Sequence, residues 1–139
     1  MKVITIEGEQ NSGKTTLVRN VLRRLVNDGA EVLCYETYGH LRDDFHAVVI
    51  WRGRKITLCS IGDLITYIRK GIEKARITWS DILLNTRTLS VEEEKYKQSL
   101  PPECDLRSIS VTPPNEKNVE AFIKQNQVAL ETIMAMLSE

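Results

Sequence analysis

One stretch near the amino terminus decides the fold that we expect for this chain: Gly8-Glu9-Gln10-Asn11-Ser12-Gly13-Lys14-Thr15. It follows a short apolar segment at residues 3–6 and opens a long amphipathic segment that begins with Thr16. The pattern G-x-x-x-x-G-K-[ST] between a strand and a helix is typical of a phosphate-binding loop. Its glycines let the backbone aim several N–H groups at one anion, and the helix start adds its positive dipole end. We therefore expect residues 8–16 to bind the phosphates of a nucleoside triphosphate.

Four side chains are the candidates for chemistry at these phosphates. Lys14 offers an ammonium to the terminal phosphates, and Thr15 offers a hydroxyl to Mg²⁺, which prefers oxygen ligands. Asp63 is the expected carboxylate for holding the metal or orienting water, and the alternative is that it caps a helix beginning at Leu64. Glu36 ends the second predicted strand, where it is expected to hold an acceptor hydroxyl or order a water; the alternative is an exposed glutamate.

Predicted strands alternate with predicted helices along the rest of the chain. We expect strands at residues 3–6, 31–36, 45–51, 55–60, 81–85 and 106–110, with a polar loop over residues 38–44. We expect helices at residues 14–28, 64–76, 90–98 and after Pro113-Pro114. Ser90 and Glu93 form a predicted capping box for the third helix. The last helix is expected to bury six apolar side chains: Val119, Phe122, Ile123, Leu130, Ile133 and Leu137.

This order predicts an α/β fold in one domain over residues 1–139, with a mostly parallel sheet covered by helices on both faces. The strands at 45–51 and 55–60 are expected to form an antiparallel hairpin. Ligands of such sheets bind outside the carboxyl ends of the strands. We expect the residues at those ends to gather beside the phosphate loop: Glu36, Ser60, Gly62, Asp63, Asn85, Thr86, Arg87 and Thr112. Arg87 is expected to stack on a base or neutralise a phosphate, and the alternative is a surface arginine.

Charge and cysteine content limit the partners. The 19 basic and 19 acidic side chains balance, so we expect neither nucleic acid nor a membrane surface as a partner. No apolar stretch approaches the roughly 18 residues of a membrane-spanning helix, which predicts a cytoplasmic protein. Cys34, Cys59 and Cys104 have no metal-like spacing and suit a reducing compartment. The sequence does not fix the oligomeric state.

The segments Ile4–Gly8 and Ser12–Leu17 resemble the start of nucleotide and nucleoside kinases of the P-loop NTPase superfamily, thymidylate kinase especially. The chain is also similar to small nucleotide-kinase-like ATP-binding proteins of bacteria. The resemblance covers most of the chain in outline and is specific near the loop. It implies a three-layer P-loop fold, ATP and Mg²⁺. In such kinases the segment between the last strand and the last helix wraps the adenine, which implies an adenine loop at Ser110–Asn115 that includes Thr112 and Pro113.

Two departures from these kinases and one missing motif shape the functional hypotheses. The chain is shorter than a typical nucleotide kinase, which leaves little room for an acceptor-binding domain. Residues 90–103, where an arginine-rich lid is expected, contain no arginine, although such arginines contribute orders of magnitude to related transfers. Asn85-Thr86-Arg87-Thr88 lacks the lysine and aspartate of a guanine-binding motif, which favours ATP over GTP. The leading hypothesis is Mg²⁺-dependent ATP hydrolysis with Lys14, Asp63 and Glu36 as catalytic residues. The alternatives are a kinase that transfers the γ-phosphate to a small metabolite, and a nucleotide-responsive binding module with little turnover.

Overall fold

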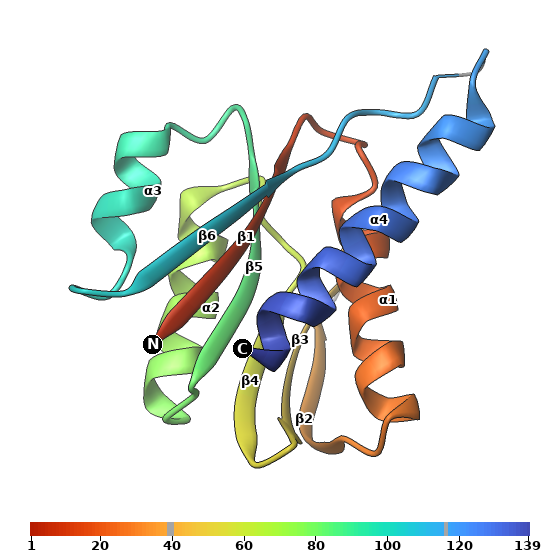
Figure 1. Cartoon of the computed structure of the whole chain (residues 1–139). Coiled ribbons are helices and arrows are strands. Elements are labelled where there is room, and N and C mark those ends of the chain that lie inside the picture. The colour runs from red at the N-terminus through yellow and green to blue at the C-terminus, as the bar shows by residue number, and fades with distance from the viewer. Residues whose placement is uncertain (39–40, 116) are drawn as a thin grey trace.

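Strands that alternate with amphipathic helices build one six-stranded mixed sheet with four helices within residues 1–38, 41–115 and 117–139, which the computed structural model describes (Figure 1). The strands are β1 (Lys2–Gly8), β2 (Glu31–Tyr38), β3 (Leu41–Trp51), β4 (Arg54–Cys59), β5 (Ile82–Thr88) and β6 (Asp105–Ser110). The helices are α1 (Lys14–Asn27), α2 (Ile65–Ile77), α3 (Glu93–Ser99) and α4 (Val119–Ser138).

The order of strands in the sheet is β2-β3-β4-β5-β1-β6. β1 runs parallel to both β5 and β6, and β4 runs parallel to β5. The pairings of β2 with β3 and of β3 with β4 are antiparallel. All seven residues of β5 are buried, as expected for a parallel strand that is covered on both faces. The predicted α/β class and the hairpin formed by β3 and β4 are confirmed.

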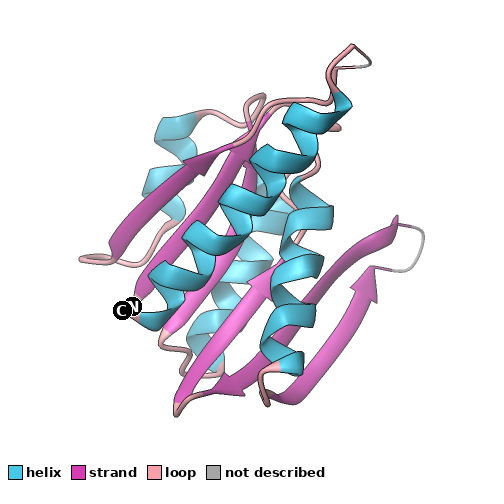
Figure 2. Cartoon of the chain, turned by 45° about the vertical axis from the view of Figure 1, so that its right-hand side comes forward, coloured by secondary structure: helices cyan, strands magenta, loops and turns pink. Residues whose placement is uncertain are grey.

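Helices cover both faces of the sheet. α1 and α4 lie in front of the sheet in Figure 2, and α2 and α3 lie behind it. Successive side chains of β1 point to opposite faces, as the pleat of a strand requires. Val3 therefore packs in the cluster with Ile68 of α2, whereas Ile4 packs in the cluster with Leu17 of α1 and Ile133 of α4. Each face of the sheet thus has its own apolar core.

Two local predictions are wrong. Leu41 to Asp44 begin β3 instead of forming a polar loop, because β2 and β3 continue to pair beyond Phe45, with Tyr38 opposite Leu41. Gly39 and His40 of the predicted loop lie outside the described residues. The predicted capping box also fails, because α3 begins only at Glu93 and its N-cap residue is Glu92 instead of Ser90.

The buried face of α4 differs from the predicted one. Ile133 and Leu137 are fully buried as predicted, but the side chains of Val119 and Ile123 are about half exposed. The last turns of α4 pack against the sheet and α1, while its first turns extend past the ends of the strands (Figure 1). The apolar spacing therefore predicts a buried face along the whole helix, whereas only its carboxyl-terminal part packs against the sheet and α1.

We expect Ile133→Ala to lower the free energy of unfolding by about 3 kcal/mol, because it leaves a cavity in a closely packed core. Ile123→Ala is the matched control on the same helix, and because Ile123 is 52% exposed it should cost less than about 0.5 kcal/mol. Urea unfolding of both variants measures the difference. Equal costs at the two positions would contradict this placement of α4.

Candidate functional site

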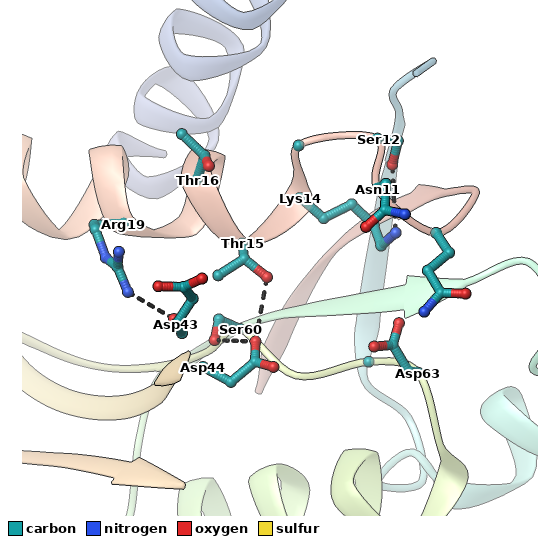
Figure 3. Close-up of a pocket in the computed structure, with 13 residues that line it drawn as sticks. Asn11, Ser12, Lys14, Thr15, Thr16, Arg19, Asp43, Asp44, Ser60 and Asp63 are labelled. Atoms are coloured by element: carbon teal, nitrogen blue, oxygen red, sulfur yellow. Dashed lines mark hydrogen bonds between the residues drawn. The ribbon is translucent and has the colours of Figure 1, made fainter. Parts of the chain in front are cut away.

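A polar pocket of about 530 Å³ lies where β1 and β4 end and β3 begins (Figure 3). Its walls come from the loop between β1 and α1, the first turns of α1, the start of β3 and the segment after β4. The residues that line it are Gln10, Asn11, Ser12, Gly13, Lys14, Thr15, Thr16, Arg19, Asp43, Asp44, Ser60, Gly62 and Asp63. The structure therefore brings most of the predicted phosphate loop together with Asp63 in one cavity.

The loop between β1 and α1 turns its backbone sharply. Asn11 and Gly13 have positive φ angles of 62° and 89°. Gly13 is the N-cap of α1, and no side chain among the described residues caps this helix or adds an acidic group to its first turn. The first N–H groups of a helix have no partner within the helix, and together they carry partial positive charge. The start of α1 is thus a site with spare hydrogen-bond donors that favours an anion.

The ammonium of Lys14 lies inside this loop. It donates hydrogen bonds to the carbonyl oxygen of Glu9 at 2.6 Å and to that of Gly8 at 3.3 Å, and it lies 3.3 Å from Ser12 Oγ. Burial lowers the pKa of Lys14 below its ordinary value, and the nearby charge of Asp63 partly opposes the shift. All three hydrogen-bond partners are neutral oxygen atoms. A bound anion would therefore supply the balancing charge that these contacts lack.

The carboxylate nearest to Thr15 is that of Asp44, which the sequence analysis did not propose. Thr15 Oγ1 donates to Asp44 Oδ1 at 3.2 Å, and Ser60 Oγ donates to the same oxygen at 3.0 Å (Figure 3). Arg19 adds a hydrogen bond to the backbone carbonyl of Asp43 at 2.6 Å. Three oxygen-bearing side chains from α1, β3 and the end of β4 therefore meet at one point. In the sequence, the two acidic residues Asp43 and Asp44 directly before the apolar run at residues 45–51 were the pattern that could have indicated this carboxylate.

Asp63 lines the pocket on the side of Lys14 (Figure 3). Its carboxylate accepts a hydrogen bond from Thr88 Oγ1 at the end of β5. The alternative role as a helix cap is wrong, because the N-cap of α2 is Leu64 and no side chain of the described residues caps it. Gly62 is needed for packing as well as for the pocket, since a Cβ there would overlap the carbonyl oxygen of Thr86.

Glu36 does not join the pocket. Three strands separate β2 from β1 in the sheet, so the end of β2 is far from the phosphate loop. Glu36 instead lies 3.3 Å from His46 Nε2 and 3.5 Å from Lys74 Nζ. The expectation that Glu36 gathers with the strand-end residues at the loop is wrong. Strand order, which local pattern does not encode, is the reason.

The alternative reading of Arg87 as a surface arginine is wrong, because its side chain is buried. Arg87 does not line the pocket, and a contact with a base or phosphate stays a prediction. Arg87 Nη2 lies 3.3 Å from Glu7 Oε1, and Nη1 donates to the carbonyl oxygen of Val91 at 2.8 Å. Glu7 is the register partner of Arg87 across β1 and β5, so the parallel pairing itself brings the two charges together. Asn85 and Thr86 likewise lie within β5 and not at the pocket.

Thr112 and Pro113 follow β6 and are exposed, outside the residues that line the pocket. The side-chain amide of Gln125 on α4 pairs with Thr112. It accepts from the backbone N–H at 3.1 Å and from Oγ1 at 2.8 Å, and it donates to the carbonyl oxygen at 3.2 Å. These three hydrogen bonds attach the segment after β6 to α4. An adenine contact at Thr112 and Pro113 stays a prediction.

No family model, curated protein or solved structure matches this chain. Among the helices formed by the described residues, none has the length and apolar character needed to cross a bilayer. The assignment of a function therefore depends on the chemistry of the pocket.

We expect Arg87→Gln to lower the free energy of unfolding by about 2 kcal/mol, because it leaves the partly buried carboxylate of Glu7 without its partner and removes the hydrogen bond to Val91. Arg69→Gln, on the exposed surface of α2, is the control and should change stability little. Chemical unfolding of both variants measures this. If Arg87→Gln weakens nucleotide binding without any loss of stability, Arg87 contacts a ligand and the structural role is refuted.

Proposed function

We propose that this chain is an ATP-binding protein with the three-layer P-loop NTPase fold, and that it hydrolyses the terminal phosphoanhydride bond of ATP in the presence of Mg²⁺. The observation that carries the proposal is the uncapped start of α1, which lies beside the buried ammonium of Lys14 in one polar cavity. Backbone N–H groups and a cation around a cavity of about 530 Å³ suit a triphosphate.

The oxygen groups at Thr15, Asp44 and Ser60 fit a magnesium ion. Hydroxyl and carboxylate oxygens are the protein ligands that Mg²⁺ takes, usually one or two together with waters and phosphate oxygens. Thr15 and Asp44 already share a hydrogen bond, so both are oriented toward the same point. Thr15 and Asp44 are therefore the residues that would hold the metal, in place of Thr15 and Asp63. When bound, the ion would neutralise charge on the phosphate oxygens.

Lys14 and the loop N–H groups stabilise the charge that develops on the β- and γ-phosphates, because they are fixed donors in a partly buried site. Hydrolysis forms a bond between a water oxygen and the γ-phosphorus and breaks the bond to the bridging oxygen, so ADP and inorganic phosphate are the products. Asp63 is the carboxylate on the Lys14 side of the pocket, where it can accept a hydrogen bond from the attacking water. Thr88 fixes the orientation of Asp63.

The variant Lys14→Ala should lower ATP turnover about 100-fold or more, since it removes a preorganised cation from the phosphates. The measurement is release of inorganic phosphate with Mg²⁺ and ATP. Lys70→Ala, an exposed lysine of α2 outside the pocket, is the matched control and should retain activity. Phosphate release that survives Lys14→Ala unchanged would overturn the proposal, and transfer of phosphate to an added metabolite would favour the kinase alternative.

Variants of Asp44 and Asp63 test separately the proposed roles in metal binding and in water orientation. We expect Asp44→Asn to raise the Mg²⁺ concentration that gives half-maximal turnover, because it removes a charged ligand of the metal. Asp63→Asn should lower the maximal rate while leaving that Mg²⁺ concentration nearly unchanged. Titrations of phosphate release against Mg²⁺ measure both. The opposite pattern would return the metal role to Asp63.

Two hydrogen bonds between α1 and the start of β3 favour a second candidate function, the nucleotide-responsive binding module. The start of β3 is tied to α1 through Thr15 with Asp44 and through Arg19 with Asp43. A ligand that binds the Thr15 hydroxyl replaces the hydrogen bond between Thr15 and Asp44. Loss of this hydrogen bond loosens the attachment of β3 to α1. Binding of ATP that depends on Lys14 but gives no phosphate release would favour this module over the hydrolase.

A further inference from the structure

A cluster of three metal-ligating side chains lies on β2 and β3, outside the phosphate pocket. Cys34 and Glu36 are two residues apart on β2, so they share one side of the strand. Glu36 pairs across the strands with His46 of β3. Cys34 Sγ lies 3.2 Å from Glu36 Oε1, and Glu36 Oε2 lies 3.3 Å from His46 Nε2. One ligand atom from each of the three residues lies within 4.8 Å of the other two.

Among the residues that the structure describes, none forms a hydrogen bond with the Nε2 atom of His46. This nitrogen is buried, and although the Glu36 carboxylate is near, no hydrogen bond of acceptable geometry joins them. The other ring nitrogen, Nδ1, lies 3.3 Å from Tyr38 Oη. A hydrogen bond at one ring nitrogen is the arrangement that orients a histidine whose other nitrogen binds a metal. Nε2 thus faces Cys34 and Glu36 as an unused ligand.

We propose that Cys34, Glu36 and His46 form a zinc-binding site with an open fourth position. Zinc takes thiolate, imidazole and carboxylate ligands with bonds of about 2.0 to 2.3 Å in a tetrahedron, which places neighbouring ligand atoms roughly 3.3 to 3.8 Å apart. The separation of 3.2 Å joins Cys34 Sγ to Glu36 Oε1 and that of 3.3 Å joins Glu36 Oε2 to His46 Nε2, so each neighbour of the carboxylate lies close to that range. All three ligand atoms lie within 4.8 Å of one another, so a small side-chain adjustment brings them around one ion. Three protein ligands leave one position for water or another ligand.

The cluster is open to solvent, so an ion can reach it. The side chain of Glu36 is 56% exposed, and Cys34 is partly exposed. Cys59 is buried and, like Cys104, does not belong to the cluster. The site is independent of the proposed nucleotide function, because none of its three residues lines the phosphate pocket.

Lys74 is the competitor for this site. Its ammonium lies 3.5 Å from Glu36 Oε1, where it balances the charge of the carboxylate. Zinc takes over this balancing role when it binds. Removal of the Lys74 charge should therefore tighten zinc binding. If the three side chains were held together only by ion pairs and bound no metal, the same change would instead loosen the cluster.

Zinc binding releases a proton from Cys34. Burial and the neighbouring Glu36 raise the pKa of the Cys34 thiol, and Lys74 opposes this. Zinc takes the thiolate form of cysteine, so binding at Cys34 displaces the thiol proton. Burial lowers the pKa of His46 below its ordinary value. The groups that face the cluster are Glu36 and Tyr38 on β2, His46 on β3 and Lys74 on α2.

The test is titration of the purified, reduced full-length chain with Co²⁺ and with Zn²⁺. Wild type should bind one Co²⁺ with a sulfur-to-cobalt charge-transfer band and tetrahedral absorption, and Zn²⁺ should displace it. Cys34→Ser should abolish the charge-transfer band, and His46→Gln should weaken binding at least about 10-fold. Cys104→Ser is the matched control and should behave as wild type. Lys74→Met should bind more tightly than wild type.

Several results would overturn the zinc site. These are the absence of a charge-transfer band in wild type, a band that persists in Cys34→Ser, or zinc affinity that is equal in wild type and Cys34→Ser. Circular dichroism confirms that each variant is folded. Should His46→Gln fail to fold, the comparison of Cys34→Ser with Cys104→Ser decides the question.

Discussion

The close approach of the chain at Gly8 is the constraint on which both the sheet and the pocket depend. The carbonyl oxygens of Glu7 and Gly8 accept hydrogen bonds from Val111 after β6 and from Leu89 after β5, at 2.8 and 3.1 Å. A Cβ at Gly8 would lie only 2.6 Å from Ser12 Oγ and 2.8 Å from the carbonyl oxygen of Val111. The loop is therefore folded down onto the ends of three strands. This position is what brings the start of α1 and Lys14 to the carboxyl edge of the sheet.

The buried charges beneath the loop follow from the same parallel pairing. Register opposes Glu7 to Arg87 and Thr5 to Asn85, so a carboxylate meets a guanidinium and a hydroxyl meets an amide between neighbouring strands. Tyr96 of α3 closes this network with a hydrogen bond to the Asn85 side chain at 2.9 Å. Buried polar groups stabilise a fold when they find partners, and most of these do; among the described residues, Asn85 Nδ2 and Arg87 Nε have no hydrogen-bond partner. Polar residues near the end of β5 therefore support the loop from below, and the loop and its neighbours line the pocket.

Secondary-structure elements that depend on the local residue pattern were predicted from the sequence. The positions of residues that depend on the order of strands in the sheet were not. The strand at residues 3–6, the loop and the start of α1 follow from glycine placement and apolar spacing, as does the hairpin of β3 and β4. No local pattern shows that β5 inserts between β4 and β1, or that β2 joins the sheet at its outer edge. Glu36 was misassigned for this reason. Asp44 was missed because its strand begins with polar residues.

The hairpin strand β3 carries both kinds of ligand that the two proposed sites need. Asp44 and His46 are two residues apart on β3. Asp44 offers hard oxygen toward the phosphate pocket, while His46 offers nitrogen beside the sulfur of Cys34. Magnesium binds oxygen ligands and zinc favours nitrogen and sulfur, so the two ions should sort between the sites by ligand chemistry.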